Sequence, residues 1–183
     1  MAKKIKGKDW YTVIAPKFFE EKVLGDTPGD DVNKVIGRKV TVPLVFVSKD
    51  MSKYYLKVRF KITKIDGTKA LTEFDGLECL RDYIARMVRH RVTRIDIVQK
   101  LKTKDEKNVV VKSMIITNKR VTRGIEKSLR EFVQQVIEKV TNENTLESLL
   151  SKILNDSIKQ KIMKEGSKIY PLRAFEIRKM EIM

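Results

Sequence analysis

The spacing of the hydrophobic residues changes along this chain of 183 residues, and that change constrains the fold more than any other feature. Between Ile36 and Phe74 apolar residues alternate with polar ones, most cleanly over 54–62, as in a half-buried strand with a basic outer face. From Ile125 to Val140 they recur at the three- and four-residue spacing of an amphipathic helix. Strands first and helices last predict an α+β fold, with a C-terminal third that is mainly helical.

Individual elements follow from the same patterns. Strands are predicted at 10–16, 40–47, 54–62, 68–74, 94–101, 108–116 and 172–182, and helices at 78–91, 125–140, 144–154 and 157–165. Asp66-Gly67 predicts a hairpin turn, and Asn144 with Glu147 predicts a helix cap. Residues 20–31 are rich in carboxylates and turn formers and are predicted to be an acidic loop.

The charge balance indicates the kind of partner. There are 40 Lys and Arg residues against 24 Asp and Glu, a net charge of +16. A surplus of this size attracts polyanions, and it is spread over arm, strands, loops and helices instead of one amphipathic helix, which favours nucleic acid over a membrane surface. Residues 1–8, with Lys3, Lys4, Lys6 and Lys8, are predicted to be a flexible basic arm, and residues 9–183 a single RNA-binding domain.

The positive charge is concentrated in one segment. Residues 86–123 hold 12 cations and three anions, a net charge of +9 in 38 residues. Many of these cations are arginines, whose guanidinium groups bind phosphate with two hydrogen bonds and stack on exposed bases. The alternative is a solvated helix face with two ordinary basic turns. Charge alone nominates Arg94, Arg120 and Arg123 as RNA contacts, together with the basic arm.

Signs of catalysis are missing from the sequence. A single histidine and a single cysteine give no zinc spacing and no disulfide, and there is no nucleotide-cradling glycine loop. His90, between two arginines, is interpreted as a stacking or phosphate contact or simply as a surface residue, and Cys79 as a small buried residue. The spacing of Asp96, Asp105 and Glu106 fits no metal loop, although these carboxylates leave a metal-dependent nuclease as a remote alternative. No catalytic residue, metal, cofactor or small-molecule substrate is therefore predicted.

The cellular location of the protein is constrained in the same way, by segments that the sequence lacks. No apolar run approaches the roughly 20 residues that a bilayer requires, and no apolar segment of the signal-peptide kind follows the basic start. We expect a soluble, cytoplasmic protein that makes no membrane contact.

Several short sequence motifs, in a fixed order along the chain, resemble those of the ribosomal protein family of archaea and eukaryotes known as S-three-a-e, or e-type S-one. They are Trp10-Tyr11, Leu24-Gly25-Asp26-Thr27-Pro28, Ile36-Gly37-Arg38, Arg81-Asp82-Tyr83, Lys102-Thr103-Lys104-Asp105 and Lys168-Ile169-Tyr170-Pro171-Leu172-Arg173. Together they span nearly the whole chain. The chain departs from the family's pattern at Leu77, Val110 and Gly124-Ile125, and it lacks the long C-terminal tail of eukaryotic members, which favours an archaeal type.

The resemblance implies a β-barrel-like mixed sheet with packed helices and a non-enzymatic role as a structural constituent of the small ribosomal subunit. It also implies a location on the platform of the small subunit, near the messenger exit side. The partners that it implies are small-subunit rRNA, neighbouring small-subunit proteins and messenger RNA. The matching positions implied as RNA contacts are Arg81, Arg86, Arg89, Arg91, Lys102, Lys104, Arg173, Arg178 and Lys179. A free RNA-binding or regulatory protein outside the ribosome remains the alternative.

Overall fold

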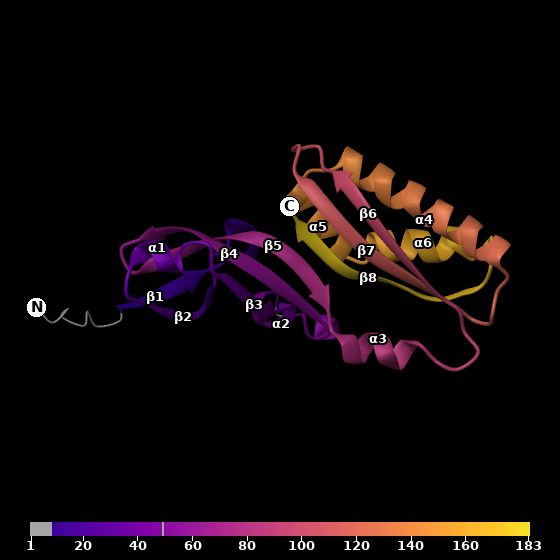
Figure 1. Ribbon diagram of the computed structural model, residues 1–183, viewed down its shortest axis with the longest axis horizontal. Helices are drawn as coiled ribbons and strands as arrows, with labels where there is room; N and C mark the ends of the chain where they lie inside the picture. Colours follow the sequence, from indigo (N-terminus) through magenta and orange to yellow (C-terminus); the bar gives the residue numbers. More distant parts are fainter. Residues whose placement is uncertain (1–8, 49) are drawn as a thin grey trace, which may run out of the picture. The chain divides into compact units, whose positions relative to one another are not determined.

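The computed structural model describes residues 9–48 and 50–183. The chain divides into two compact units, one that ends at Leu77 and one that runs from Glu78 to Met183 (Figure 1). The predicted basic arm lies outside the described residues. That residues 9–183 act as a single RNA-binding domain stays a prediction.

In the described part of the first unit there are five strands and four short helical segments. The strands are β1 (Asp9–Ile14), β2 (Val23–Gly29), β3 (Lys39–Pro43), β4 (Leu56–Asp66) and β5 (Lys69–Cys79), whose last residues pass the unit boundary. The helical segments are η1 (Lys17–Phe19), α1 (Val32–Val35), α2 (Leu44–Ser48) and η2 (Met51–Lys53). β1 is antiparallel to β2 and parallel to β5, and β3 is antiparallel to β4. The hairpin prediction is confirmed: β4 pairs with β5, and Gly67 turns with a φ of 57°.

Two predictions in this unit are wrong. The expected acidic loop at 20–31 contains strand β2, because pairing with β1 satisfies its backbone groups in spite of Gly25 and Pro28. Within that pair, Pro28 lies opposite Trp10. The expected strand at 40–47 ends at Pro43, and the β-branched run after it forms α2 instead.

Strand β4 has the predicted two faces. Leu56, Val58, Phe60 and Ile62 are buried, whereas Lys57 and Arg59 are half-buried and Lys61 is exposed. Part of this basic face is neutralised, since the Asp75 carboxylate pairs with Arg59 Nε at 2.5 Å and with Lys39 Nζ at 3.0 Å.

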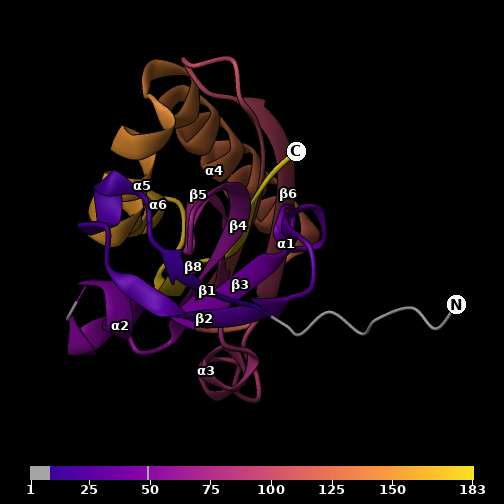
Figure 2. The same ribbon diagram turned by 90° about the vertical axis from the view of Figure 1, so that its left-hand side faces the viewer.

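The second unit combines three strands with four helices. They are α3 (Arg81–Met87), β6 (Arg94–Lys102), β7 (Asn108–Thr117), α4 (Arg123–Glu143), α5 (Leu146–Leu154), α6 (Ser157–Gly166) and β8 (Leu172–Ile182). β7 lies between β6 and β8 and is antiparallel to both. The helices α4, α5 and α6 lie together, and α3 lies apart from them (Figure 2).

Sequence reading finds nearly every element of this unit. The predicted strands and the three C-terminal helices are confirmed, and α6 ends at Gly166. Two details are wrong. The cap of α5 is Thr145, whose hydroxyl accepts a hydrogen bond from the Ser148 backbone N–H at 3.4 Å, and not Asn144. Helix α3 runs from Arg81 to Met87 instead of over 78–91, because Glu78 and Cys79 still belong to β5, Val88 is extended and Arg91 has a φ of 64°.

The predicted α+β class is confirmed, although the sheet does not close into a barrel among the described strands. None of the helices in the described part of the chain has the length and apolarity needed to cross a bilayer.

The burial of α4 yields a stability prediction. Leu129 is fully buried, so Leu129→Ala should lower the free energy of unfolding of the second unit by about 3 kcal/mol, through lost burial and a residual cavity. Urea unfolding followed by helical circular dichroism measures this change. The exposed Lys127→Ala is the control and should change stability by less than about 0.5 kcal/mol. Equal effects of the two variants would contradict the described packing.

Candidate nucleic-acid interface

Two connections of the second unit and the start of one of its strands enclose a hollow of about 620 Å³, which we call the loop hollow. Its lining residues are Arg89, His90, Arg91, Val92, Asn118, Lys119, Arg120 and Arg173. They come from the α3–β6 connection, the β7–α4 connection and the start of β8. Five of the eight carry a permanent positive charge, and none is acidic.

Buried Thr117 ties these connections together. Its hydroxyl donates to the Lys119 carbonyl at 2.6 Å and accepts from the Thr93 backbone N–H at 3.1 Å. The Thr93 hydroxyl in turn accepts from the Val121 N–H at 3.2 Å, and the Asn118 N–H donates to the Pro171 carbonyl at 3.2 Å. The cations of the loop hollow are therefore carried on loops whose backbones are bonded to one another.

Within the described part of the chain, the charges of the loop hollow are not compensated by carboxylates. Among residues 9–48 and 50–183, no ion pair joins any of its five cations to a carboxylate. Arg91 also adopts left-handed backbone geometry, which is uncommon outside glycine and is often found at functional sites. Like charges held close together favour the binding of an anion.

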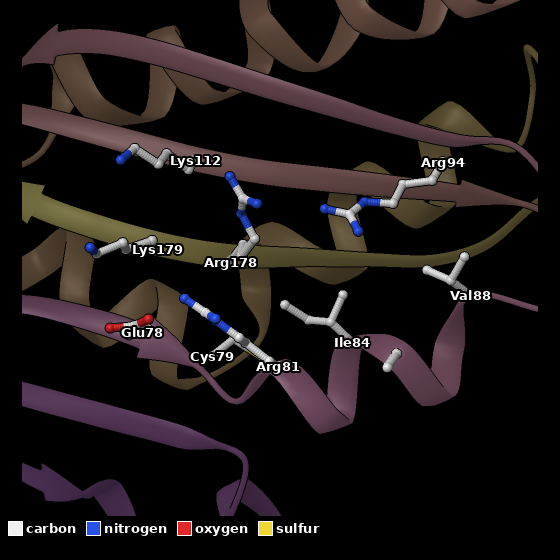
Figure 3. A pocket seen from close by; sticks show the side chains of 10 residues that line it. Glu78, Cys79, Arg81, Ile84, Val88, Arg94, Lys112, Arg178 and Lys179 are labelled. Atoms are coloured by element: carbon white, nitrogen blue, oxygen red, sulfur yellow. The ribbon is translucent and has the colours of Figure 1, made fainter.

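A second hollow of about 460 Å³ lies between α3 and strands β6 to β8, and we call it the helix hollow (Figure 3). Its lining residues are Glu78, Cys79, Arg81, Ile84, Ala85, Val88, Arg94, Lys112, Arg178 and Lys179. Gln99 of β6 donates to the Gln134 carbonyl of α4, so Arg94, an odd number of residues away, lies on the opposite strand face. The helix hollow is therefore on the face of these strands that α4 leaves uncovered.

Two irregularities in β8 bring arginines to the two hollows. Ser113 is paired with Ile177 and Lys112 with Lys179, so Arg178 is an extra residue in the β7–β8 ladder. The register shifts again between Ile116 and Thr117, which leaves Arg173 as a second extra residue. β-Bulges of this kind change the direction in which side chains point from the strand. As a result the consecutive residues Arg178 and Lys179 both line the helix hollow, and Arg173 lines the loop hollow.

The helix hollow is partly neutralised. Arg94 pairs with Asp96 at 2.8 Å, and Glu181 pairs with both Lys112 and Lys179 at 3.0 and 2.8 Å. Arg81 and Arg178 have no such partner among the described residues. Figure 3 shows the side chains of Arg81, Arg94 and Arg178 extending into the space between α3 and the strands.

A buried carboxylate connects α3 to the rest of the unit. The Tyr83 hydroxyl donates to Glu176 Oε1 at 3.2 Å, and Lys159 Nζ of α6 lies 2.5 Å from the same oxygen. Burial raises the pKa of Glu176, and the hydrogen bonds from Lys159 and Tyr83 oppose that rise. This three-residue contact anchors the helix that forms one wall of the helix hollow.

The predicted RNA contacts fall into four groups. Arg89, His90, Arg91, Arg120 and Arg173 line the loop hollow, and Arg81, Arg94, Arg178 and Lys179 line the helix hollow. Arg86, Lys102, Lys104 and Arg123 are exposed outside both hollows. Lys3, Lys4, Lys6 and Lys8 lie outside the described residues.

The lining residues Asn118, Lys119 and Lys112 were not among the predicted contacts, and neither was the carboxylate Glu78. Lys119 and Asn118 adjoin Arg120 in the same connection, so their position beside a predicted contact was an available signal. Lys112 lies in the middle of a buried strand, and only the pairing with β8 brings it to the helix hollow.

Two of the three carboxylates on which the nuclease alternative rested have structural partners instead. Asp96 pairs with Arg94, and Asp105 Oδ2 accepts a hydrogen bond at 2.9 Å from the Leu146 N–H at the start of α5. Among the described residues there is no group of three or more His, Cys, Asp or Glu that could hold a metal ion.

Comparison with known proteins identifies the family of this chain. A sequence model of the Ribosomal S3Ae family matches residues 1–183. A protein named small ribosomal subunit protein eS1 from Methanopyrus kandleri is 37% identical over 184 residues, covering 98% of this chain and 87% of its own length. Proteins of the same name from Methanothrix thermoacetophila and Sulfurisphaera tokodaii are 37% and 33% identical, covering 100% and 98% of this chain and 86% and 93% of their own lengths.

The chain belongs to the Ribosomal S3Ae family. The predicted resemblance is thereby confirmed, and so is the expectation of a ribosomal protein instead of an enzyme. The three relatives described above are archaeal, in agreement with the predicted archaeal type.

In this S3Ae family member the single cysteine should be chemically inert. Cys79 is 2% exposed, and burial, helped by the charge of Glu176, raises the pKa of its thiol to about 12. Because the thiolate is the reactive form, modification by a disulfide reagent at pH 8 should be roughly a hundredfold slower in the folded protein than in urea. The absorbance of the released thiol measures both rates. Equal rates would contradict the burial of Cys79.

Proposed function

We propose that this chain is a structural constituent of the small ribosomal subunit that binds rRNA by pairing phosphates with the cations of the loop hollow and the helix hollow. The observation that carries the proposal is the loop hollow, where five cations from two connections and the start of β8 lie together without a carboxylate partner among the described residues. The names of the relatives support the assignment to the small subunit.

The chemistry of the two hollows suits RNA backbone. Phosphate groups accept two parallel hydrogen bonds from guanidinium, and seven of the ten cations in the hollows are arginines. Neutralising phosphates also releases counterions, which makes the affinity fall steeply with salt. The basic face of β4 is a weaker candidate, because Asp75 already pairs with Arg59 and Lys39.

More specific parts of the proposed ribosomal role are supported only by the resemblance to the family. A site on the platform near the messenger exit side, contacts with neighbouring proteins and contact with messenger RNA are predictions from the resemblance. Lys102, Lys104, Arg86 and Arg123 stay predicted RNA contacts outside the hollows.

Removing charge from the loop hollow tests the proposal. The triple variant Arg89→Ala, Arg91→Ala and Arg120→Ala should bind small-subunit rRNA about a hundredfold more weakly at about 0.1 M salt. The slope of log affinity against log salt should become shallower by about 2 to 3, because three phosphate contacts are lost. Filter binding over a salt series measures both quantities.

A charge-matched variant serves as control. Arg130→Ala, Lys139→Ala and Lys164→Ala remove three exposed cations outside both hollows and should weaken binding far less. Equal losses in the two triple variants would contradict the proposed interface and indicate binding by net charge alone.

A sucrose gradient separates the ribosomal role from the alternative of a free RNA-binding protein. Tagged protein expressed in an archaeal host should sediment with small subunits, and the loop-hollow variant should shift toward the top of the gradient. A wild-type protein found mainly in the soluble pool would overturn the ribosomal role and favour the alternative.

A further inference from the structure

We propose that the helix hollow holds one unstacked nucleotide of the bound RNA, with its phosphate on the arginines and its base against the apolar wall of α3. This inference rests on the proposed function, because it names what one of the two RNA sites recognises. It assigns the hollows different roles: backbone contact at the loop hollow and a flipped nucleotide at the helix hollow.

The first step is the cationic side of the helix hollow. Arg81 comes from α3 and Arg178 from β8, and neither has a carboxylate partner among the described residues. Their side chains share a space with Arg94 (Figure 3). Guanidinium groups held together repel one another, and a phosphate between Arg81 and Arg178 would remove that repulsion.

The second step is the apolar side. Ile84, Ala85 and Val88 of the α3 segment line the same hollow. Val88 is only half-buried, and Ala85 is exposed. Apolar side chains contribute nothing to phosphate binding, but they provide a surface for the face of a base. In the loop hollow the only apolar lining residue is Val92, so that site lacks such a surface.

The third step is size and shape. A hollow of about 460 Å³ falls in the range of sites that enclose a small organic ligand. The bulge at Arg178 adds a planar guanidinium beside Lys179, and arginine planes stack on unpaired bases. The cations, the apolar wall and the guanidinium plane of Arg178 together fit an unstacked nucleotide better than a continuous duplex, because the bases of a duplex are already stacked on one another.

Two RNA hairpins of identical stem sequence test the inference, one fully paired and one with a single unpaired 2-aminopurine nucleotide. The wild-type protein should bind the bulged hairpin about tenfold more tightly, which is the usual contribution of stacking one base. The fluorescence of 2-aminopurine should also change on binding, because the base leaves its neighbours in the RNA.

Filling the hollow should remove this preference without changing charge. Ala85→Leu should bind the two hairpins within about twofold of each other, with an unchanged salt slope. The control Gln135→Leu places the same side chain on an exposed position of α4 and should keep the preference. Arg178→Lys keeps the charge but loses the planar fork, so it should lower the preference as well.

The outcomes separate this inference from the proposed function. Equal binding of both hairpins by the wild type, with steep salt dependence, would overturn the nucleotide site and leave rRNA binding intact. Failure to bind either hairpin or small-subunit rRNA would overturn the proposed function. A preference that survives in Ala85→Leu would place the base elsewhere and contradict the assignment to the helix hollow.

Discussion

The pairing of β7 with β8, with its two register shifts, is the constraint on which both hollows depend. In a regular strand consecutive side chains point to opposite faces, so Arg178 and Lys179 could not both line one hollow. The extra residues Arg178 and Arg173 break that alternation at two places. One strand thus supplies cations to both hollows, while Phe175 and Met180 remain in the core.

The distribution of carboxylates then distinguishes the surfaces. On β4 and in the helix hollow, carboxylates such as Asp75 and Glu181 hold several cations in ion pairs. In the loop hollow no ion pair joins a cation to a carboxylate among the described residues. Partial neutralisation with an apolar wall suits recognition of a nucleotide, whereas unrelieved charge suits backbone phosphate.

Much of this could be predicted from sequence, because periodicity and charge are local properties. The helical spacing of 125–140, the strands around it and the charge of 86–123 all correspond to features of the structure. The loop hollow could not be predicted, since it requires Thr117 to bond Lys119 of the β7–α4 connection and Thr93 of the distant α3–β6 connection. The bulges in β8 also depend on a partner strand that is distant in sequence.

Ultraviolet crosslinking of assembled small subunits, followed by mass spectrometry of nucleotide-bearing peptides, tests the central claim most directly. The account predicts crosslinked nucleotides on the connection 88–93, on residues 118–121 and on β8 around Arg173 and Arg178. Crosslinks confined to the exposed face of α4, with none on these segments, would contradict it.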